Sequence, residues 1–343
     1  MQKRKFVVVM LMVAGIIACK KEVIERFAGF QKPANFPLPV YKLQNNEITK
    51  EGFELGRKLF YDPVLSADSS ISCGNCHIQT SAFTHHGHTV SHGIHDRLGT
   101  RNSPAIMNLA WYKSFMWDGG IGDLDLQPAA PITNPVEMDE TMENVLQKLR
   151  RSKHYPAMFE QAFGSSEINT TVFLKSLSQF MLMCISSNSK YDSVMRNEAG
   201  KTFTSAEQEG YSIFKQNCNA CHKEPLFTDN SFRNNGIGTG RFDDKGLYAV
   251  TLNINDEYKF KVPSLRNVSF TAPYMHDGRL LTLEAVLDHY STHVKASPTL
   301  DPLLQQNVQP GIVLTAAEKN NLIAFLKTLD DRSFLLNPAL SEQ

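Results

Sequence analysis

The sequence carries no excess of charge of either sign, since its 343 residues include 35 Lys and Arg against 35 Asp and Glu. A protein that binds nucleic acid normally shows a basic excess, so we expect no nucleic-acid partner. Cysteine is also scarce, and 6 residues in so long a chain exclude a disulfide-stabilised scaffold. The 42% apolar residues and 20 Gly are typical of a globular protein and exclude a chain disordered throughout. The length predicts about two domains.

Long apolar runs are missing as well, which excludes a multi-span membrane protein. The one notable run, residues 6–18, follows Lys3, Arg4 and Lys5. Its 13 residues are too few to cross a bilayer, which takes about 20, but a basic start before such a run is typical of a secretory signal. The run ends in Ile-Ile-Ala-Cys, which resembles the bacterial lipoprotein box, where the cysteine is acylated. We predict a lipoprotein-type signal peptide at residues 1–18, a membrane lipid anchor at Cys19 and a periplasmic location. Ordinary signal cleavage, with Cys19 uninvolved, is the alternative.

Two pentapeptides of the pattern Cys-x-x-Cys-His contain most of the cysteines. Their pattern residues are Cys73, Cys76, His77, Cys218, Cys221 and His222. This is the attachment pattern of c-type haem: the two thiols form thioethers with the porphyrin, and the histidine binds iron from the proximal side. The sequence therefore predicts two covalently attached haem c groups, with His77 and His222 as proximal ligands.

Three other interpretations of the cysteine pairs are weaker. In a zinc site the pairs usually lie about 15–20 residues apart, whereas these motifs are 145 residues apart. A thioredoxin-type redox motif needs a βαβ setting, which the flanking sequence does not suggest. Disulfides within each pair would be strained.

The sequence around the two motifs also repeats. Gly56-x-x-x-Phe60 precedes the first motif and Gly210-x-x-x-Phe214 the second, and a phenylalanine follows each motif's histidine at a distance of 103 residues. Repetition of spacing indicates a duplicated structural unit.

The segments between these markers predict helices. Thr204-x-x-Glu207 and Thr315-x-x-Glu318 are capping boxes, in which hydroxyl and carboxylate bind the free amides of the first turn. We expect a mainly α fold of two cytochrome c-like haem domains in tandem, with short strands and long loops, one such strand falling at residues 247–251. The predicted boundaries are a leader at 19–44, domains at 45–195 and 200–332, and a tail at 333–343.

The motifs together resemble one known family, the bacterial di-haem cytochrome c peroxidases and their relatives of the MauG type. The similarity covers nearly all of the chain after the predicted signal peptide. Besides the haem motifs, it includes residues 59–66, 101–104, 117–119, 131–138, 260–267 and 273–278.

The resemblance implies an enzyme that reduces hydrogen peroxide to water with electrons from a small donor cytochrome. In the peroxidases of this family, the C-terminal haem accepts the electrons and the N-terminal haem binds and cleaves peroxide. Domain 45–195 would then be the peroxidatic domain and domain 200–332 the electron-transfer domain. The family's peroxidases are usually homodimers, so a homodimer is a further expectation.

Three catalytic residues follow from the same resemblance. Glu137 and Gln127 match the distal-pocket pair, whose carboxylate moves a proton from one peroxide oxygen to the other. Trp117 matches the aromatic residue between the haems, where an indole can relay an electron.

A calcium ion between the domains is also implied. Asn102 matches a ligand that binds through its side chain, and Thr271 and Pro273 match ligands that bind through backbone carbonyls. Ligation by oxygen alone suits a hard cation.

The distal ligand of the C-terminal haem departs from the peroxidase pattern. The peroxidases place a methionine eight residues after the threonine of a Thr-Leu-Glu sequence, but Tyr290 lies eight residues after Thr282. MauG-type members use a tyrosine here, and a phenolate favours ferric iron and lowers the reduction potential. Met275 is the alternative ligand.

The loop after the first motif departs as well, because it holds His85, His86, His88, His92 and His95. The family's peroxidases have a displaceable distal histidine in this loop. His92 or His95 could bind the resting N-terminal iron. Alternatively, neither binds, the loop is solvated and the first haem is open.

Three hypotheses for function remain. The leading one is a peroxidase that takes electrons from a soluble c-type cytochrome or similar carrier. The second is a MauG-type oxidase that draws electrons from a protein substrate, which Tyr290 favours. The third is a di-haem electron carrier without catalysis, which has no use for Glu137 beside an open iron.

Overall fold

The computed structural model describes residues 27–343, so the predicted signal peptide and Cys19 lie outside the described residues. The predicted fold class is confirmed: within this range the protein is mainly helical, with long loops and one two-stranded antiparallel sheet. The helices are α1 (Lys50–Tyr61), α2 (Cys73–Cys76), α3 (Ala129–Thr133), α4 (Met142–Arg151), α5 (Tyr155–Phe163), α6 (Thr170–Met183), α7 (Lys190–Met195), α8 (Ser205–Asn217), α9 (Tyr248–Thr251), α10 (Leu283–Asp288), α11 (Ala316–Lys327) and α12 (Arg332–Leu335). The strands are β1 (Phe232–Arg233) and β2 (Phe260–Lys261).

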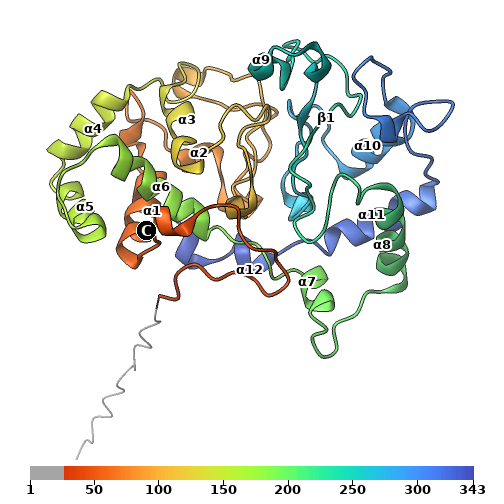
Figure 1. Ribbon diagram of the computed structural model, residues 1–343, viewed down its shortest axis with the longest axis horizontal. Helices are drawn as coiled ribbons and strands as arrows, with labels where there is room; N and C mark the ends of the chain where they lie inside the picture. The colour runs from red at the N-terminus through yellow and green to blue at the C-terminus, as the bar shows by residue number, and fades with distance from the viewer. Residues whose placement is uncertain (1–26) are drawn as a thin grey trace, which may run out of the picture.

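The two halves of the chain lie side by side. Figure 1 shows α1 to α6 on one side of the molecule and α8, α10 and α11 on the other. Each side has its own apolar core, one built around α1 and α6 and the other around α8 and α11. No helix within residues 27–343 is both long and apolar enough to cross a membrane.

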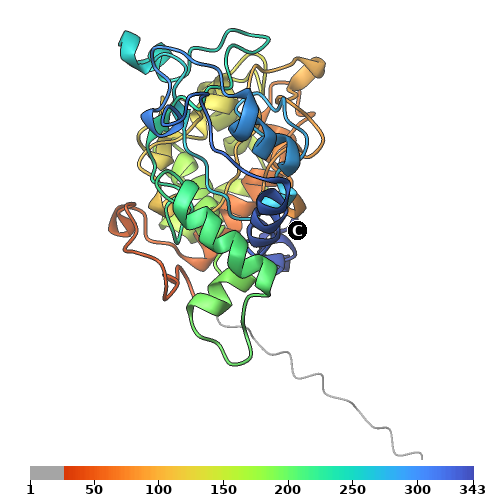
Figure 2. The same ribbon diagram turned by 90° about the vertical axis from the view of Figure 1, so that its right-hand side faces the viewer.

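The same helix pair is built twice, as the repeated spacings predict. Helix α1 packs against α6 and α8 against α11, and Figure 2 shows α8 (green) running alongside α11 (dark blue). A glycine allows each contact: a Cβ at Gly56 would lie 1.9 Å from the carbonyl oxygen of Ser176, and one at Gly210 1.9 Å from that of Asn321. The capping boxes at Thr204 and Thr315 are both formed.

The C-terminal tail crosses back to the first half of the chain. Tyr61 Oη donates to the carbonyl of Leu340 at 2.8 Å, and Gln79 Nε2 donates to that of Asn337 at 2.8 Å. Phe334 packs on Phe83 with ring centroids 5.7 Å apart. The tail therefore fastens the two halves together, while the exact domain boundaries stay a prediction.

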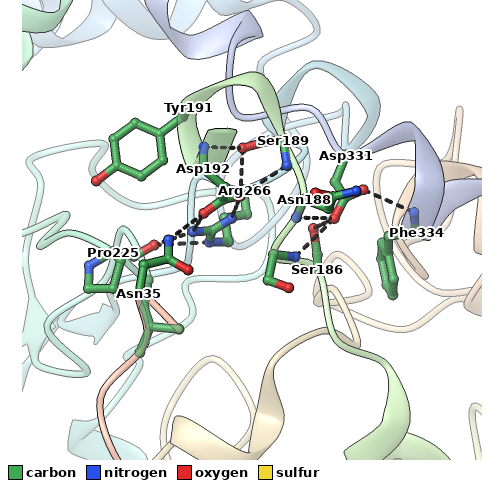
Figure 3. Close-up of polar contacts among 12 residues, drawn as sticks. Asn35, Ser186, Asn188, Ser189, Tyr191, Asp192, Pro225, Arg266, Asp331 and Phe334 are labelled. Atoms are coloured by element: carbon green, nitrogen blue, oxygen red, sulfur yellow. Dashed lines mark hydrogen bonds and ion pairs between the residues drawn. The ribbon is translucent and has the colours of Figure 1, made fainter. Parts of the chain in front are cut away.

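A buried polar network holds the linker between the halves (Figure 3). Arg266 Nη1 and Nη2 donate to the two carboxylate oxygens of Asp192 in α7, each at 2.8 Å, and both side chains are fully buried. Asp331 accepts from the backbone amides of Ser187 and Asn188 at 2.9 and 2.8 Å. Charges from the second half thus fix the backbone of residues 187–192.

The predicted strand at residues 247–251 is wrong, because this segment forms the short helix α9. Leu247 N donates to the carbonyl of Lys259 at 2.8 Å, but within residues 27–343 no strand pairs with α9. Its amides bond locally instead: Thr251 N donates to the carbonyl of Leu247 at 3.0 Å and Leu252 N to that of Tyr248 at 2.9 Å. Local hydrogen bonds therefore satisfy the backbone of α9 without a partner strand.

Candidate haem sites

Both Cys-x-x-Cys-His motifs form a single helical turn. The amide of His77 donates to the carbonyl of Cys73, and that of His222 to the carbonyl of Cys218, each at 2.9 Å. The first turn is α2 itself, and the second follows directly from α8. Each turn therefore presents two thiols and an imidazole together, as covalent haem attachment requires.

The two imidazoles are oriented by backbone carbonyls. His77 Nδ1 lies 2.7 Å from the carbonyl oxygen of Phe83, and His222 Nδ1 lies 3.2 Å from that of Phe227 and 3.1 Å from that of Pro263. A proton on Nδ1 leaves the Nε2 lone pair for a metal. Burial also lowers the pKa of both histidines, which keeps them neutral.

Each motif lies in the wall of its own cavity, and the two cavities share part of their lining. Apolar side chains predominate in the rest of each wall, including Phe60, Ile71, Leu177 and Met181 in the first and Phe214, Leu287, Leu322 and Leu326 in the second. A flat apolar macrocycle with two vinyl groups and an axially ligated metal fits these walls. The residues present therefore fit haem c at both motifs.

The second cavity brings together both predicted alternatives for its distal ligand. Tyr290 lies in the π-helical segment His289–His293, and Asn235 Nδ2 lies 3.4 Å from Tyr290 Oη and 3.3 Å from Met275 Sδ. Burial raises the pKa of Tyr290 to about 12, so a phenolate here needs a cation or hydrogen-bond donor beside it. The sequence did not single out Asn235.

Glu137 and Gln127, the pair expected beside peroxide, line the first cavity together with Pro131. Burial raises the pKa of Glu137 above its ordinary value, which brings this carboxyl closer to neutral pH. Gln127 Nε2 lies 3.8 Å from Met116 Sδ. The pair therefore faces the space beside the first haem motif.

Comparison of the two halves explains why the cavities differ. The bridge Phe115–Ile121 recurs as Tyr274–Leu280, a shift of 159 residues, and the same shift relates Pro131 to Tyr290. A residue with no ligating side chain thus occupies the position in the first half that Tyr290 occupies in the second.

Trp117 lines both cavities. Its indole Nε1 donates to the carbonyl of Asn102 at 2.8 Å, and its own carbonyl accepts from the amide of Lys261 at 2.8 Å. The indole is thus held by the first half of the chain and the backbone of Trp117 by the second, and the residue lies between the two haem motifs.

The three predicted calcium ligands lie along the second cavity. Asn102 Nδ2 donates to the carbonyls of His88 and Thr89, each at 3.2 Å, which orients the amide oxygen away from them. Thr271 and Pro273 lie on one loop of the other half. The structure thus brings oxygen donors of both halves to the same wall.

Three of the five loop histidines pack together. The His88 ring is stacked on His85 at 4.1 Å and lies 4.3 Å from His92, and His88 Nδ1 is 3.1 Å from His92 Nε2. These rings do not form a metal-binding group, and no group of three His, Cys, Asp or Glu in the described chain does. His92 lines the first cavity, whereas His95 lies outside that lining, 3.8 Å from Asp68 and largely exposed. Of the two candidate distal ligands, only His92 reaches the cavity.

Comparison with known proteins points to one family. A family model described as di-haem cytochrome c peroxidase matches residues 50–200. The methylamine utilization protein MauG of Methylorubrum extorquens is 34% identical over 315 residues, covering 91% of this chain and 86% of that protein. The cytochrome c551 peroxidase of Nitrosomonas europaea is 31% identical over 306 residues, covering 86% and 84%. A crystal structure of a MauG-like protein associated with microbial copper homeostasis has a TM-score of 0.82 at 32% identity, covering 91% of this chain and 98% of that one.

Proposed function

Because the chain belongs to the di-haem cytochrome c peroxidase family, we propose that it reduces hydrogen peroxide to water with electrons from a small c-type cytochrome or a similar donor. One observation carries the proposal: the first cavity holds Glu137 and Gln127 beside Pro131, where the second holds Tyr290. A cavity with an acid–base group and no tyrosine or histidine at this position suits a small oxidant. A cavity with a tyrosine ligand suits electron transfer alone.

The chain's own residues hold both cofactors. Cys73 and Cys76 would attach the first haem and Cys218 and Cys221 the second, with His77 and His222 as the iron ligands. When bound, the haems supply redox-active iron that accepts electrons from the donor and delivers them to peroxide. The second site is the electron entry point and the first is the peroxidatic site.

Glu137 moves the proton. Reduction of one peroxide molecule to two water molecules consumes two electrons and two protons. A carboxylate oxygen of Glu137 takes the proton from one peroxide oxygen and returns it to the other, which leaves as water. Gln127 offers its amide as a hydrogen-bond donor to peroxide in the same cavity.

Trp117 connects the two sites. Trp117 lines both cavities; its indole donates to the carbonyl of Asn102, and its backbone carbonyl accepts from the amide of Lys261. With both haems bound, this side chain would relay electrons from the second site to the first. A calcium ion bound by Asn102, Thr271 and Pro273 would hold the two halves in register around it.

His92 is the resting-state ligand if the loop supplies one. Its Nε2 faces His88 Nδ1, so ligation of iron requires that this contact break. His95 would have to leave Asp68 and move from the surface, which makes it the poorer choice.

The same proposal places the enzyme in the periplasm, attached to a membrane through acylated Cys19, and includes a homodimer. Covalent haem c attachment and the lipoprotein-type signal of residues 1–18 support this location. The anchor would keep the enzyme near membrane-bound electron carriers.

A MauG-type oxidase that acts on a protein substrate is the second candidate, favoured by Tyr290. The two are separated by mixing the purified di-haem protein with peroxide and a reduced c-type cytochrome. Peroxide-dependent cytochrome oxidation supports the peroxidase. Peroxide consumption that oxidises a protein side chain but no cytochrome indicates the oxidase. If neither occurs, the protein is an electron carrier and Glu137 has no catalytic role.

A further inference from the structure

The loop after β1 places an amide group between the two possible ligands of the second haem. We propose that Asn235 is a positioning residue that selects the Tyr290 oxygen, rather than the Met275 sulfur, as the distal ligand. The inference rests on the proposed function, in which Tyr290 is that ligand. It adds a residue that sets the ligand and therefore the redox properties of the electron-entry site.

The orientation of the Asn235 amide follows from its own loop. Its Oδ1 accepts from the backbone amide of Ile237 at 3.2 Å, so the Nδ2 end faces the cavity. There Nδ2 lies 3.4 Å from Tyr290 Oη and 3.3 Å from Met275 Sδ. Because Oδ1 is hydrogen-bonded to Ile237, the Asn235 side chain presents only its Nδ2 donor to the two possible ligands.

The backbone of Asn235 is tied to the segment that carries Tyr290. His289 Nε2 donates to the carbonyl of Asn235 at 3.0 Å, and His289 is buried. His289 and Tyr290 are successive residues of a π-helical segment, a local departure from α-helix often found at functional sites. Asn235 therefore contacts the ligand segment twice, once through its side chain and once through its backbone.

The neighbours of Asn235 keep this loop from shifting. Asn234 Nδ2 donates to Ser297 Oγ at 3.0 Å and to Thr299 Oγ1 at 2.9 Å. Gly236 has a φ of +69°, and a Cβ there would lie 2.5 Å from Val294. A closely packed loop holds the amide in one place instead of letting it follow either ligand.

An N–H donor does not treat the two ligands equally. A phenolate oxygen accepts a charge-assisted hydrogen bond, which is among the strong ones, whereas a thioether sulfur is a weak acceptor. Burying a phenolate without such a donor is costly. The Asn235 amide thus lowers the free energy of the tyrosine-ligated state more than that of the methionine-ligated state.

The redox consequence follows from ligand identity. Methionine together with histidine raises the reduction potential of a haem, and an anionic phenolate stabilises ferric iron. By favouring Tyr290, Asn235 keeps the potential of the second haem low. The choice of donor protein then depends on a residue that does not itself touch the metal.

The test uses the di-haem protein with Asn235→Leu, Tyr290→Phe, Met275→Leu and the surface control Asn255→Leu. The ligand is read from the electron paramagnetic resonance and near-infrared spectra of the ferric protein, and the potential by spectroelectrochemistry. In Asn235→Leu we expect the ratio of tyrosine- to methionine-ligated haem to fall roughly 10- to 100-fold, the loss of one hydrogen bond to a charged oxygen. The potential of the second haem rises with it, while Met275→Leu and the control keep the phenolate signature.

Asn235→Asp is the second variant, in case leucine disturbs the loop. It keeps the acceptor for Ile237 but has no donor when ionised, so we expect the same change of ligand. In one outcome, Tyr290→Phe loses the phenolate signature while both Asn235 variants keep the wild-type spectrum and potential. Tyr290 is then the ligand, but Asn235 does not select it. If Tyr290→Phe leaves the spectrum unchanged, the tyrosine ligand and the inference built on it both fail.

Discussion

Replacing Glu137 by Gln removes one proton-transfer group and leaves the shape of the first cavity almost unchanged. Apart from the haem-attachment residues, the titratable side chains in that wall are Glu137, His92 and Arg101. Arg101 is paired with Asp118 and Asp244 and keeps its proton. His92 Nε2 already faces His88. Glu137 is therefore the one group placed to exchange a proton with peroxide.

The size of the expected loss of rate follows from the small number of titratable side chains in this wall. A positioned acid–base group contributes about 10²- to 10⁴-fold to a rate, and with no substitute in the wall we expect a Glu137→Gln loss of this size in kcat/KM for peroxide. The sign of the pH effect follows from the raised pKa. The ionised form of Glu137 is lost as the pH falls through the pKa of this carboxyl, so the wild-type rate falls with it. The variant has no carboxyl here and should not show this acidic decline in rate.

The assay follows oxidation of a reduced c-type cytochrome at several peroxide concentrations and pH values. Glu143→Gln is the matched control, because Glu143 lies on the exposed face of α4, where its carboxylate accepts a hydrogen bond from Gln147. His92→Ala tests whether His92, whose Nε2 faces His88, takes any part in proton transfer, and this variant should retain most of the rate. A Glu137→Gln enzyme with the wild-type rate and the same acid limb would refute the reasoning.

Three predictions concern stability. Asp192→Ala leaves Arg266 charged and buried without its partner, so we expect a loss of about 3–5 kcal/mol in the free energy of unfolding by urea; an unchanged midpoint would contradict this. Burial raises the pKa of Asp330 to about 6, so its native carboxyl binds a proton more tightly than the unfolded one and stability falls as pH rises from about 4 to about 6. Asp330→Asn should therefore raise the free energy of unfolding by up to ~3 kcal/mol at pH 7 and leave it unchanged below pH ~4. A gain in stability of the same size at every pH would show that the Asp330 carboxyl is not its cause. Gly210→Ala should cost about 1–3 kcal/mol because its Cβ meets the backbone of Asn321, whereas Gly122→Ala, with open space around it, should cost less than half of that.

The duplicated unit explains how one chain holds two different sites. Both halves use the same turn for the thiols and the same close helix contact at a glycine. They differ where Pro131 and Tyr290 take equivalent positions. Pro131 lies in α3 and Tyr290 in the π-helical segment His289–His293, so the two halves differ here both in the side chain and in the local helix geometry.

The sequence by itself determined the haem attachment, the helix starts and the duplication. These are local features: five successive residues define each attachment turn, and a capping box needs only a hydroxyl and a carboxylate three residues apart. The mainly helical fold and the family follow from them. The strand expected at residues 247–251 failed because a strand depends on a distant partner, and local spacing cannot supply one.

Only the tertiary structure decided which of these residues meet. It brought His92 and not His95 to the first cavity, placed Trp117 in the walls of both cavities, and set Asn235 against Tyr290, which is 55 residues further along the chain. Each of these contacts joins segments whose spacing in sequence is set by loops of irregular length. Their register comes from close packing of the two halves, and no pattern within a single segment encodes it.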